Sequence, residues 1–424
     1  MQTPSHARDL TSRVVITGMG AITPVGNTVE ETWQSLVQGK SGIDTITHFD
    51  FRKLPVHIAG EIKGFQPHEF IVPKDARRMS RSSQLAVATL KQTMANAGLP
   101  YPLNGANAER TGVYLGTSMG HWDKAEQGFM EYLKGGALKA NPFSIPASSP
   151  NLCAFHLCVR LNAQGYTNTV ATACSAGTVA IAEAAEVIKR GRCDVMITGG
   201  VEANINETTI AGFIAMRGLS MRNDDPGGAS RPFEAGRDGF ILSEGCALFV
   251  LERLDRALAR GATIYAEILG SAHTSDTYHV VIPDPQSQGA IRAMRWALED
   301  AGISLEAVDY INAHGPSTPA GDPAETYAIK SIFGERAYEI PVSSTKSMIG
   351  HSFGAAGAIE AMACVQSIRT NTLHPTINYH TPDPACDLDY VPNKARSHPV
   401  NIALSNSFGL GGQNSCLVLG RYTN

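Results

Sequence analysis

The chain has 424 residues, a formal net charge of −4 and 43% hydrophobic residues, enough for a large core in one to three domains. No basic cluster suggests nucleic-acid binding, and no stretch is long and apolar enough to span a membrane. The eight cysteines are scattered, with no CxxC pair and no zinc spacing, so we expect neither a disulfide framework nor a metal site. A reducing compartment fits this pattern, and we expect a cytoplasmic protein.

The N-terminal region combines a polar start with a buried strand. Residues 1–12 lack the apolar core of a secretory signal, and we expect a flexible arm there. Residues 13–20 predict a strand that runs into a glycine turn, but no complete GxGxxG follows, which excludes a dinucleotide site. The elements expected next are helices over 28–38 and 80–97, a strand over 112–116, and an excursion over the surface or into a partner over 121–150.

One thiol stands at the junction of a strand and a helix. An apolar run predicts a strand over 166–173, and small apolar residues at helical intervals predict a helix over 175–190. Cys174 lies between them, where free N–H groups and the positive end of the helix dipole would stabilise a thiolate and lower the pKa of the thiol. We interpret Cys174 as a nucleophile. The alternative is a small buried hydrophobic residue, which most free cysteines are.

The same order of elements recurs after residue 260. We expect an N-terminal half over 13–260, with an insertion toward the surface or a dimer partner, and a C-terminal half over 261–424. The remaining predicted elements are strands over 194–198, 246–251, 264–272, 308–313, 401–404 and 416–419, an insertion-like stretch over 201–244, a helix over 287–301, and a helix that opens at 351–357. This repetition predicts a duplicated α/β fold whose functional turns meet at the middle.

Two histidines occupy such turns in the second half. His314 ends a buried strand, and His351 directly precedes a helix. With Cys174 they indicate acyl transfer, because two imidazoles can donate hydrogen bonds to a developing oxyanion or enolate. Either histidine alone could instead be an ordinary polar group at a strand end. Lys346 lies in a segment with few other charges, which favours a buried lysine with Glu360 as its partner.

Several short motifs surround these residues in a fixed order. They are Thr172-Ala173-Cys174-Ser175-Ala176, Arg231-Pro232-Phe233, Arg237-Asp238-Gly239-Phe240, His314-Gly315, Ser317-Thr318-Pro319, Lys346, Gly350-His351, Asn406-Ser407-Phe408-Gly409 and Gly411-Gly412. In this order, from about residue 13 to 419, the chain resembles the β-ketoacyl-[acyl carrier protein] synthases of the thiolase superfamily. Within that family it is similar to the type II condensing enzymes of bacterial fatty acid synthesis and to type II polyketide ketosynthases.

The resemblance implies a five-layered αβαβα thiolase-like fold, a dimer, and a decarboxylative Claisen condensation without a cofactor. Cys174 would accept an acyl chain from acyl carrier protein, and malonyl-acyl carrier protein would lose CO₂ and attack as its enolate. His314 and His351 would stabilise the enolate, while the backbone N–H groups of Cys174 and Phe408 would form the oxyanion hole. Lys346 and Glu360 match family positions that support the site electrostatically, and Asp322 and Glu325 match supporting acidic positions just beyond the His314 turn.

The chain departs from the family pattern at the phosphopantetheine arm. Pro316 replaces a threonine whose hydroxyl usually holds the arm, and Ser243 replaces a usual glycine. Thr318, with Ser317, is then expected to bind the arm. Losing one hydroxyl contact would cost roughly 0.5–1.5 kcal/mol.

The acyl pocket shows a further departure. Met119 and Phe408 match positions that gate the pocket. Ser144 stands where an aromatic side chain commonly closes the pocket of the partner subunit, so extended acyl groups would be tolerated.

Related activities are distinguished by the same residues. Elongation in fatty acid synthesis is the leading interpretation, with acyl carrier protein and a second copy of the chain as partners. The main alternative is a ketosynthase subunit of a type II polyketide or polyene synthase that forms a heterodimer with a chain-length-factor paralogue. A non-catalytic partner subunit would lack the nucleophile, and a coenzyme A thiolase would carry a second cysteine that the loop over 406–412 lacks. Initiating synthases that use coenzyme A carry asparagine in place of His351.

Overall fold

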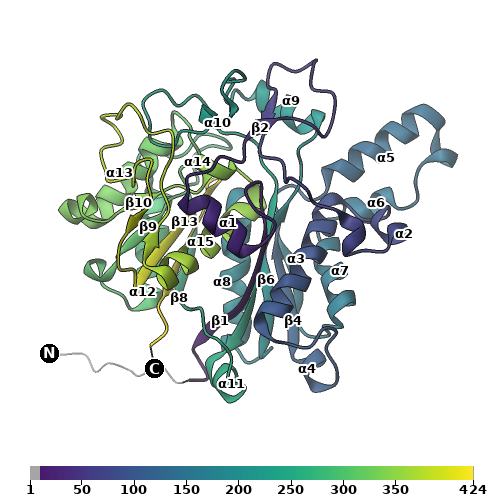
Figure 1. Cartoon of the computed structure of the whole chain (residues 1–424), viewed down its shortest axis with the longest axis horizontal. Coiled ribbons are helices and arrows are strands. Elements are labelled where there is room, and N and C mark those ends of the chain that lie inside the picture. Colours follow the sequence, from purple (N-terminus) through teal and green to yellow (C-terminus); the bar gives the residue numbers. More distant parts are fainter. Residues whose placement is uncertain (1–9, 424) are drawn as a thin grey trace.

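The computed structural model describes residues 10–423 and shows a mixed α/β architecture (Figure 1). Most of the expected arm over 1–12 lies outside these residues. The strands of the main sheet are β1 (Val14–Ile22), β4 (Thr111–Gly116), β5 (Thr167–Val170), β6 (Val195–Glu202), β7 (Gly245–Arg253), β8 (Ala266–Ser275), β9 (Tyr310–Asn312), β10 (Val342–Ser343), β13 (Ile402–Gly409) and β14 (Gln413–Gly420). Two short ladders pair β2 (Asp44–Thr45) with β3 (Ile58–Ala59) and β11 (Thr372–Leu373) with β12 (Arg396–Ser397).

The order of the strands in the main sheet reveals the duplication. In the described chain the order is β10-β9-β13-β14-β8-β1-β7-β6-β4-β5. Counted outward from the centre, the first half runs β1, β7, β6, β4, β5 and the second β8, β14, β13, β9, β10, with the same parallel and antiparallel pairings. The two first strands pair antiparallel at the centre, with Val14 opposite Ile268. The predicted duplicated α/β fold is confirmed.

Helices divide this strongly bent sheet into layers. The central layer holds α8 (Ala176–Lys189) and α15 (Ala356–Thr370), which lie between the two halves of the sheet (Figure 1). The outer layers hold α3 (Arg81–Ala97) with α7 (Leu152–Leu161) and α12 (Gln288–Ala301) with α13 (Gly321–Phe333). A Cβ at Gly177 would lie 2.8 Å from the backbone N of Ala358, so only glycine lets α8 and α15 approach this closely. The result is the expected αβαβα arrangement.

The remaining elements are short or peripheral. They are the helices α1 (Val29–Val37), α2 (Pro73–Ala76), α4 (Ala106–Glu109), α5 (Trp122–Gly135), α6 (Ser144–Ser148), α9 (Glu207–Ala215), α10 (Pro226–Ala229), α11 (Leu254–Ala259) and α14 (Lys346–Ile349), and the 3-10 turns η1 (Pro67–Glu69), η2 (Ala137–Lys139), η3 (Ala173–Ser175), η4 (Leu305–Ala307), η5 (Gly334–Tyr338) and η6 (Phe353–Ala355). Within residues 10–423 no helix is long and apolar enough to cross a membrane.

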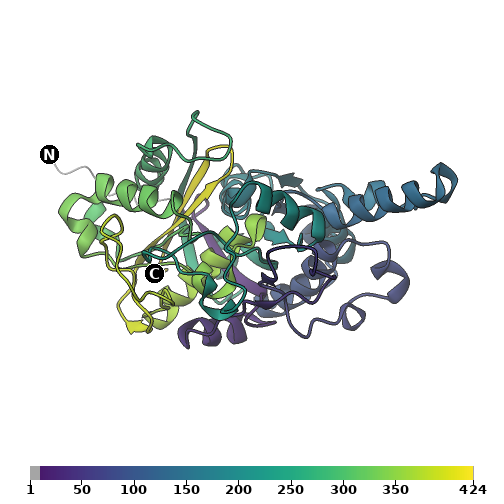
Figure 2. The ribbon, with the colours of Figure 1, turned by 90° about the horizontal axis from the view of Figure 1, so that it is seen from above.

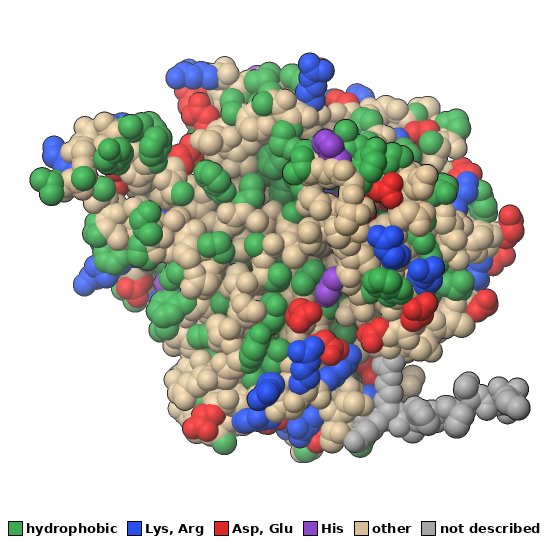
Figure 3. All heavy atoms as spheres, turned by 180° about the vertical axis from the view of Figure 1, so that it is seen from behind, with side chains coloured by type: hydrophobic (Ala, Val, Ile, Leu, Met, Phe, Trp, Pro, Cys, Tyr) green, Lys and Arg blue, Asp and Glu red, His purple; other side chains and the backbone are tan. Residues whose placement is uncertain are grey.

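The segment over 121–150 leaves the body of the molecule as a helical arm. Helix α5 projects sideways, and α6 returns beside it (Figures 1 and 2). Its side chains Phe129 and Leu133 are each 60% exposed, and hydrophobic side chains cover much of the arm where it stands out at the left of Figure 3. Among residues 10–423, strand β5 is the last strand of the sheet and pairs only with β4. The arm therefore presents an apolar surface, and β5 presents a strand edge that no other described strand covers.

Candidate active site

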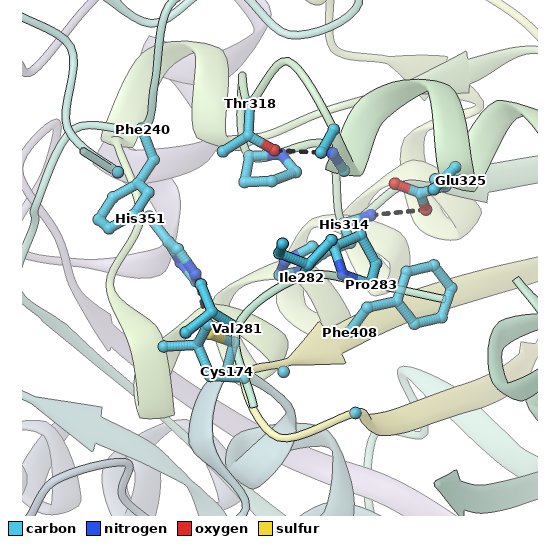
Figure 4. Close-up of a pocket in the computed structure, with 18 of the residues that line it drawn as sticks. Cys174, Phe240, Val281, Ile282, Pro283, His314, Thr318, Glu325, His351 and Phe408 are labelled. Carbon is cyan, nitrogen blue, oxygen red and sulfur yellow. Dashed lines mark hydrogen bonds between the residues drawn. The ribbon is translucent and has the colours of Figure 1, made fainter. Parts of the chain in front are cut away.

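Three turns bring Cys174, His314 and His351 to one cavity. Cys174 lies in η3 between β5 and α8, His314 follows β9, and His351 lies between α14 and η6. All three line a cavity of about 300 Å³ (Figure 4). The predicted meeting of turns from both halves is therefore present in the structure.

The thiol and the second histidine are in direct contact. His351 Nε2 lies 3.0 Å from Cys174 Sγ. On its other side, His351 Nδ1 accepts the backbone N–H of Phe353 at 3.3 Å, and the imidazole stacks on the Phe353 ring with centroids 4.5 Å apart. Since Nδ1 is an acceptor, a neutral His351 carries its proton on Nε2 and directs an N–H at the sulfur.

The first histidine is oriented in the same way by a lysine. Lys346 Nζ donates to the backbone carbonyl of His314 at 2.6 Å and lies 3.4 Å from its Nδ1. The two imidazole centroids are 5.3 Å apart, with ring planes at 82°. Burial lowers the pKa of His314 and of His351 well below 6.5, and the Lys346 ammonium adds to both shifts. Both rings are thus neutral at pH 7 and can present Nε2–H donors.

Lys346 forms the buried ion pair that the sequence suggested. Its ammonium contacts a carboxylate oxygen of Glu360 on α15, and both side chains are almost completely excluded from solvent. Burial raises the pKa of Glu360, while the adjacent Lys346 opposes the rise. The pair places a positive charge directly behind His314.

Two acidic residues of α13 hold the turn that carries His314. The carboxylate of Glu325 accepts the N–H groups of His314 and Gly315 at 2.9 and 2.8 Å. Asp322 accepts the N–H of Phe233 at 2.7 Å and that of Thr318 at 3.1 Å. Burial raises the pKa of both carboxyl groups, and these backbone hydrogen bonds counteract the shift. The two residues therefore fix backbone geometry around the site.

The expected low pKa of the nucleophile is wrong for this structure. Burial raises the pKa of Cys174 to about 11, although the N–H of Leu410 and the Lys346 charge both act to lower it. The carboxylates of Glu202 and Glu360 raise it further. The sequence argument counted the helix terminus but not the loss of solvent, and desolvation of the thiolate dominates.

The end of β13 packs against the nucleophile. A Cβ at Gly409 would lie 3.1 Å from the backbone N of Cys174, so this glycine permits the close approach. The neighbouring Phe408 lines the cavity, and its ring centroid lies 5.9 Å from that of His314. The structure brings Cys174 and Phe408 together, while their joint role as an oxyanion hole stays a prediction.

The two hydroxyls expected at the phosphopantetheine arm point in different directions. Thr318 lines the cavity together with Pro316, and its hydroxyl accepts the N–H of Gly321 at 3.0 Å. Ser317 is fully buried with φ +72°, and its Oγ accepts the N–H of Arg231 at 3.0 Å. This corrects the expectation for Ser317, because its hydroxyl serves the protein interior.

The residues expected at the acyl pocket are separated within one chain. Met119 packs against the apolar cluster that contains Cys174 and Phe353. Ser144 lies in the arm, where its Cβ is 2.4 Å from the position of a Cβ added to Gly128. A place for Ser144 in a partner's pocket therefore stays a prediction that depends on the dimer.

Ser243 lies between the backbone of Gly60 and the turn that carries His351. Its hydroxyl lies 3.2 Å from the carbonyl oxygen of Gly60, and its backbone N–H donates to the carbonyl oxygen of His351 at 3.0 Å. The serine therefore adds a hydrogen bond next to the turn that carries His351.

Other cavity residues were not identified from the sequence. Val281, Ile282 and Pro283, from the loop between β8 and α12, lie beside the predicted residues (Figure 4). So does Phe240, which belongs to one of the motifs named above but was not assigned to the cavity. The run of apolar residues in an exposed loop was the only signal for the first three. Glu202, whose carboxylate acts on the thiol, was missed because it is one charge at the end of an apolar strand.

Comparisons with known proteins agree with one another over nearly the whole chain. Family models described as "Beta-ketoacyl synthase, N-terminal domain" and "Beta-ketoacyl synthase, C-terminal domain" match residues 11–257 and 265–380. The chain is 47% identical over 410 residues to "3-oxoacyl-[acyl-carrier-protein] synthase 2" of Synechocystis sp., which covers 97% of this chain and 98% of that protein.

Solved structures give the same result. "The ishigamide ketosynthase/chain length factor" superposes with a TM-score of 0.90 at 34% identity, covering 97% of this chain and 99% of that chain. A type II PKS ketosynthase in complex with its acyl-carrier protein, bound to the hexaketide, superposes with a TM-score of 0.88 at 33% identity, with the same coverage.

Proposed function

Because the chain belongs to the β-ketoacyl synthase family, we propose that it condenses an acyl chain held on Cys174 with malonyl-acyl carrier protein. The products are 3-oxoacyl-acyl carrier protein and CO₂, as in fatty acid elongation. The observation that carries the proposal is the geometry of Cys174, His314 and His351 in one cavity, with both imidazoles oriented through Nδ1.

The first half-reaction is transfer of the acyl group. The sulfur of Cys174 attacks the thioester carbonyl of the acyl carrier protein, a new C–S bond forms, and the phosphopantetheine thiolate leaves. Cys174 loses its thiol proton in this step, and the leaving thiolate gains one, so the number of protons is unchanged. Backbone N–H groups of Cys174 and Phe408 stabilise the oxyanion of the tetrahedral intermediate.

The second half-reaction uses the two histidines. Malonyl-acyl carrier protein loses CO₂, and the electron pair of the broken C–C bond becomes an enolate whose oxygen accepts the Nε2–H bonds of His314 and His351. The enolate carbon then attacks the acyl group on Cys174 and expels the thiolate, which regains a proton. Neutral imidazoles suit this role, because they donate hydrogen bonds without protonating the enolate.

Thr318 and the cavity mouth receive the substrate's arm. The Thr318 hydroxyl can still donate a hydrogen bond to an arm amide, since the bond to Gly321 uses it only as an acceptor. No cofactor beyond the carrier's phosphopantetheine takes part in this scheme. We place the reaction in the cytoplasm, in keeping with eight free cysteines.

The arm of α5 and α6 supports an assembly with a second chain. Exposed apolar side chains on α5 and the free edge of β5 are surfaces that association would cover. A chain-length-factor paralogue, as in the ketosynthase/chain length factor neighbour, would make this chain the catalytic subunit of a polyketide synthase. The higher identity to a 3-oxoacyl-[acyl-carrier-protein] synthase 2 favours fatty acid elongation in a homodimer.

Intact-mass spectrometry tests the first half-reaction. The protein is incubated with acyl carrier proteins that carry acyl groups of increasing length. We expect one acyl adduct on Cys174, no adduct on Cys174→Ala, and an unchanged adduct on Cys158→Ala, which removes the one cysteine that is not fully buried. An adduct on another residue, or none with any carrier, would overturn the proposal.

A further inference from the structure

A fully buried glutamate lies where the functional turns of the two halves meet. Glu202 is the last residue of β6, and its side chain has no exposed surface. Its Oε2 accepts the N–H of Ser118 at 2.6 Å, in the turn after β4, and the N–H of Gly354 at 3.3 Å, in η6. Its Oε1 accepts a hydrogen bond from the side-chain amide of Asn204. One carboxylate thus ties the turn before Met119 to the turn after His351.

The backbone packing shows that this junction is tight. A Cβ added to Gly354 would lie 2.4 Å from the backbone N of Ser118, and one added to Gly200 would lie 2.2 Å from the carbonyl oxygen of Gly354. The turn after β4 and the turn after His351 therefore touch through backbone atoms, and one N–H group of each donates to the Glu202 carboxylate. Without this acceptor, both N–H groups would be buried and unpaired.

We propose that Glu202 is a positioning residue that holds the Met119 turn and the His351 turn against each other, and so sets the place of the His351 imidazole relative to Cys174. The inference rests on the proposed function, because it concerns the geometry needed for acyl transfer and condensation. Glu202 acts through the backbone N–H groups of Ser118 and Gly354.

The charge of Glu202 reaches the thiol as well. Glu202 raises the pKa of Cys174, and burial raises the pKa of Glu202 itself to about 8. The other charged groups that act on this thiol are the Lys346 ammonium and the Glu360 carboxylate, and the neutral imidazole of His351 contacts it. Position and charge can be separated by two substitutions.

Glu202→Asp keeps the charge but shortens the side chain by one C–C bond, about 1.5 Å, so the carboxylate no longer reaches both N–H groups. Glu202→Gln removes the charge but keeps a carbonyl oxygen that accepts the N–H groups of Ser118 and Gly354. Its NH₂ group can donate to the side-chain oxygen of Asn204 once that amide rotates. Glu252→Asp is the matched control. Glu252 is equally buried on β7, near the opposite end of β6, and bonds Thr17 and Arg260.

The experiment measures three quantities for each full-length variant: the melting temperature, the rate of Cys174 acylation across a ladder of acyl lengths, and the rate of condensation. With Glu202→Asp we expect condensation to fall between about tenfold and a hundredfold, as for a displacement of about 1 Å at a reacting centre, and the acyl-length profile to change. Glu202→Gln rescues most of the condensation rate, and its thiol reacts faster with iodoacetamide at pH 8. Glu252→Asp changes only the melting temperature.

Each other result contradicts the inference. If Glu202→Asp condenses at the wild-type rate and keeps the wild-type acyl-length profile, the hydrogen bonds from Ser118 and Gly354 to Glu202 are not needed. A loss in Glu202→Gln as large as in Glu202→Asp would show that keeping an acceptor for the N–H groups of Ser118 and Gly354 does not preserve condensation, which contradicts the positioning role. If all three variants lose stability and rate together, Glu202 is only structural. Failure of wild type to accept any acyl group would instead contradict the proposed function.

Discussion

The reactivity of Cys174 should depend steeply on pH because the cysteine is buried. Its pKa is raised to about 11 from an ordinary value of 9.0. At pH 8 about one Cys174 in a thousand would then be a thiolate, against about one in ten for an ordinary cysteine. The rate of alkylation should therefore rise about tenfold per pH unit from pH 7 to 10, without a plateau.

The assay is alkylation by iodoacetamide followed by intact-mass spectrometry in a Cys158→Ser background, which removes the one cysteine that is not fully buried. His351→Ala removes the N–H directed at the sulfur 3.0 Å away, and a hydrogen bond to a charged group contributes about 1.5–3 kcal/mol. That corresponds to a further rise of roughly one to two units in the pKa of the thiol, so alkylation at pH 8 should fall about tenfold to a hundredfold. The control is His273→Ala, which removes an imidazole on β8 that contacts Ser415 of β14. A plateau below pH 8, or an unchanged rate in His351→Ala, would refute this reasoning.

Further predictions concern the ion pair, the half-reactions and the acyl pocket. Lys346→Met should lower the free energy of unfolding, measured in urea, by about 3–5 kcal/mol, because it leaves the buried Glu360 carboxylate without a partner. The double variant Lys346→Met with Glu360→Leu should recover stability but not condensation. Recovered condensation in the double variant would show that the ion pair has no part in the mechanism. Cys174→Gln should still decarboxylate malonyl-acyl carrier protein, measured as released CO₂, whereas His314→Ala should do so much more slowly; equal CO₂ release by both would contradict the division of roles. Ser144→Phe should shorten the longest acyl chain accepted without slowing short chains, and an identical chain-length cutoff would place Ser144 outside the pocket.

The sequence was sufficient for the arrangement of the fold and for the main contacts of the site. Repeated strands and small-residue helices predicted the duplication, because each pattern is local and periodic. The isolated charge of Lys346 indicated a buried partner, and Glu360 is that partner. The helices α7, α9 and α13 were not predicted. Glycine interrupts α9, glycine and proline open α13, and α7 is a ten-residue, mostly apolar run whose length alone does not separate a helix from a strand.

Properties that depend on three-dimensional surroundings were not accessible in this way. The pKa of Cys174 moves opposite to expectation because desolvation and distant carboxylates outweigh the local helix terminus. Ser317 and Thr318 are neighbours of similar chemistry, yet a backbone φ of +72° turns the Ser317 hydroxyl toward Arg231. Glu202 acquires its contacts from two turns that are more than two hundred residues apart in the chain.

The most direct test of the condensation itself follows the carrier protein. Acylated wild-type protein is mixed with malonyl-acyl carrier protein in which all three malonyl carbons are ¹³C, and the mass of the carrier is measured. The proposed function requires an acyl carrier protein extended by two labelled carbons with release of one labelled CO₂, in wild type and not in Cys174→Ala. Release of CO₂ without an extended chain, or extension by Cys174→Ala, would contradict it.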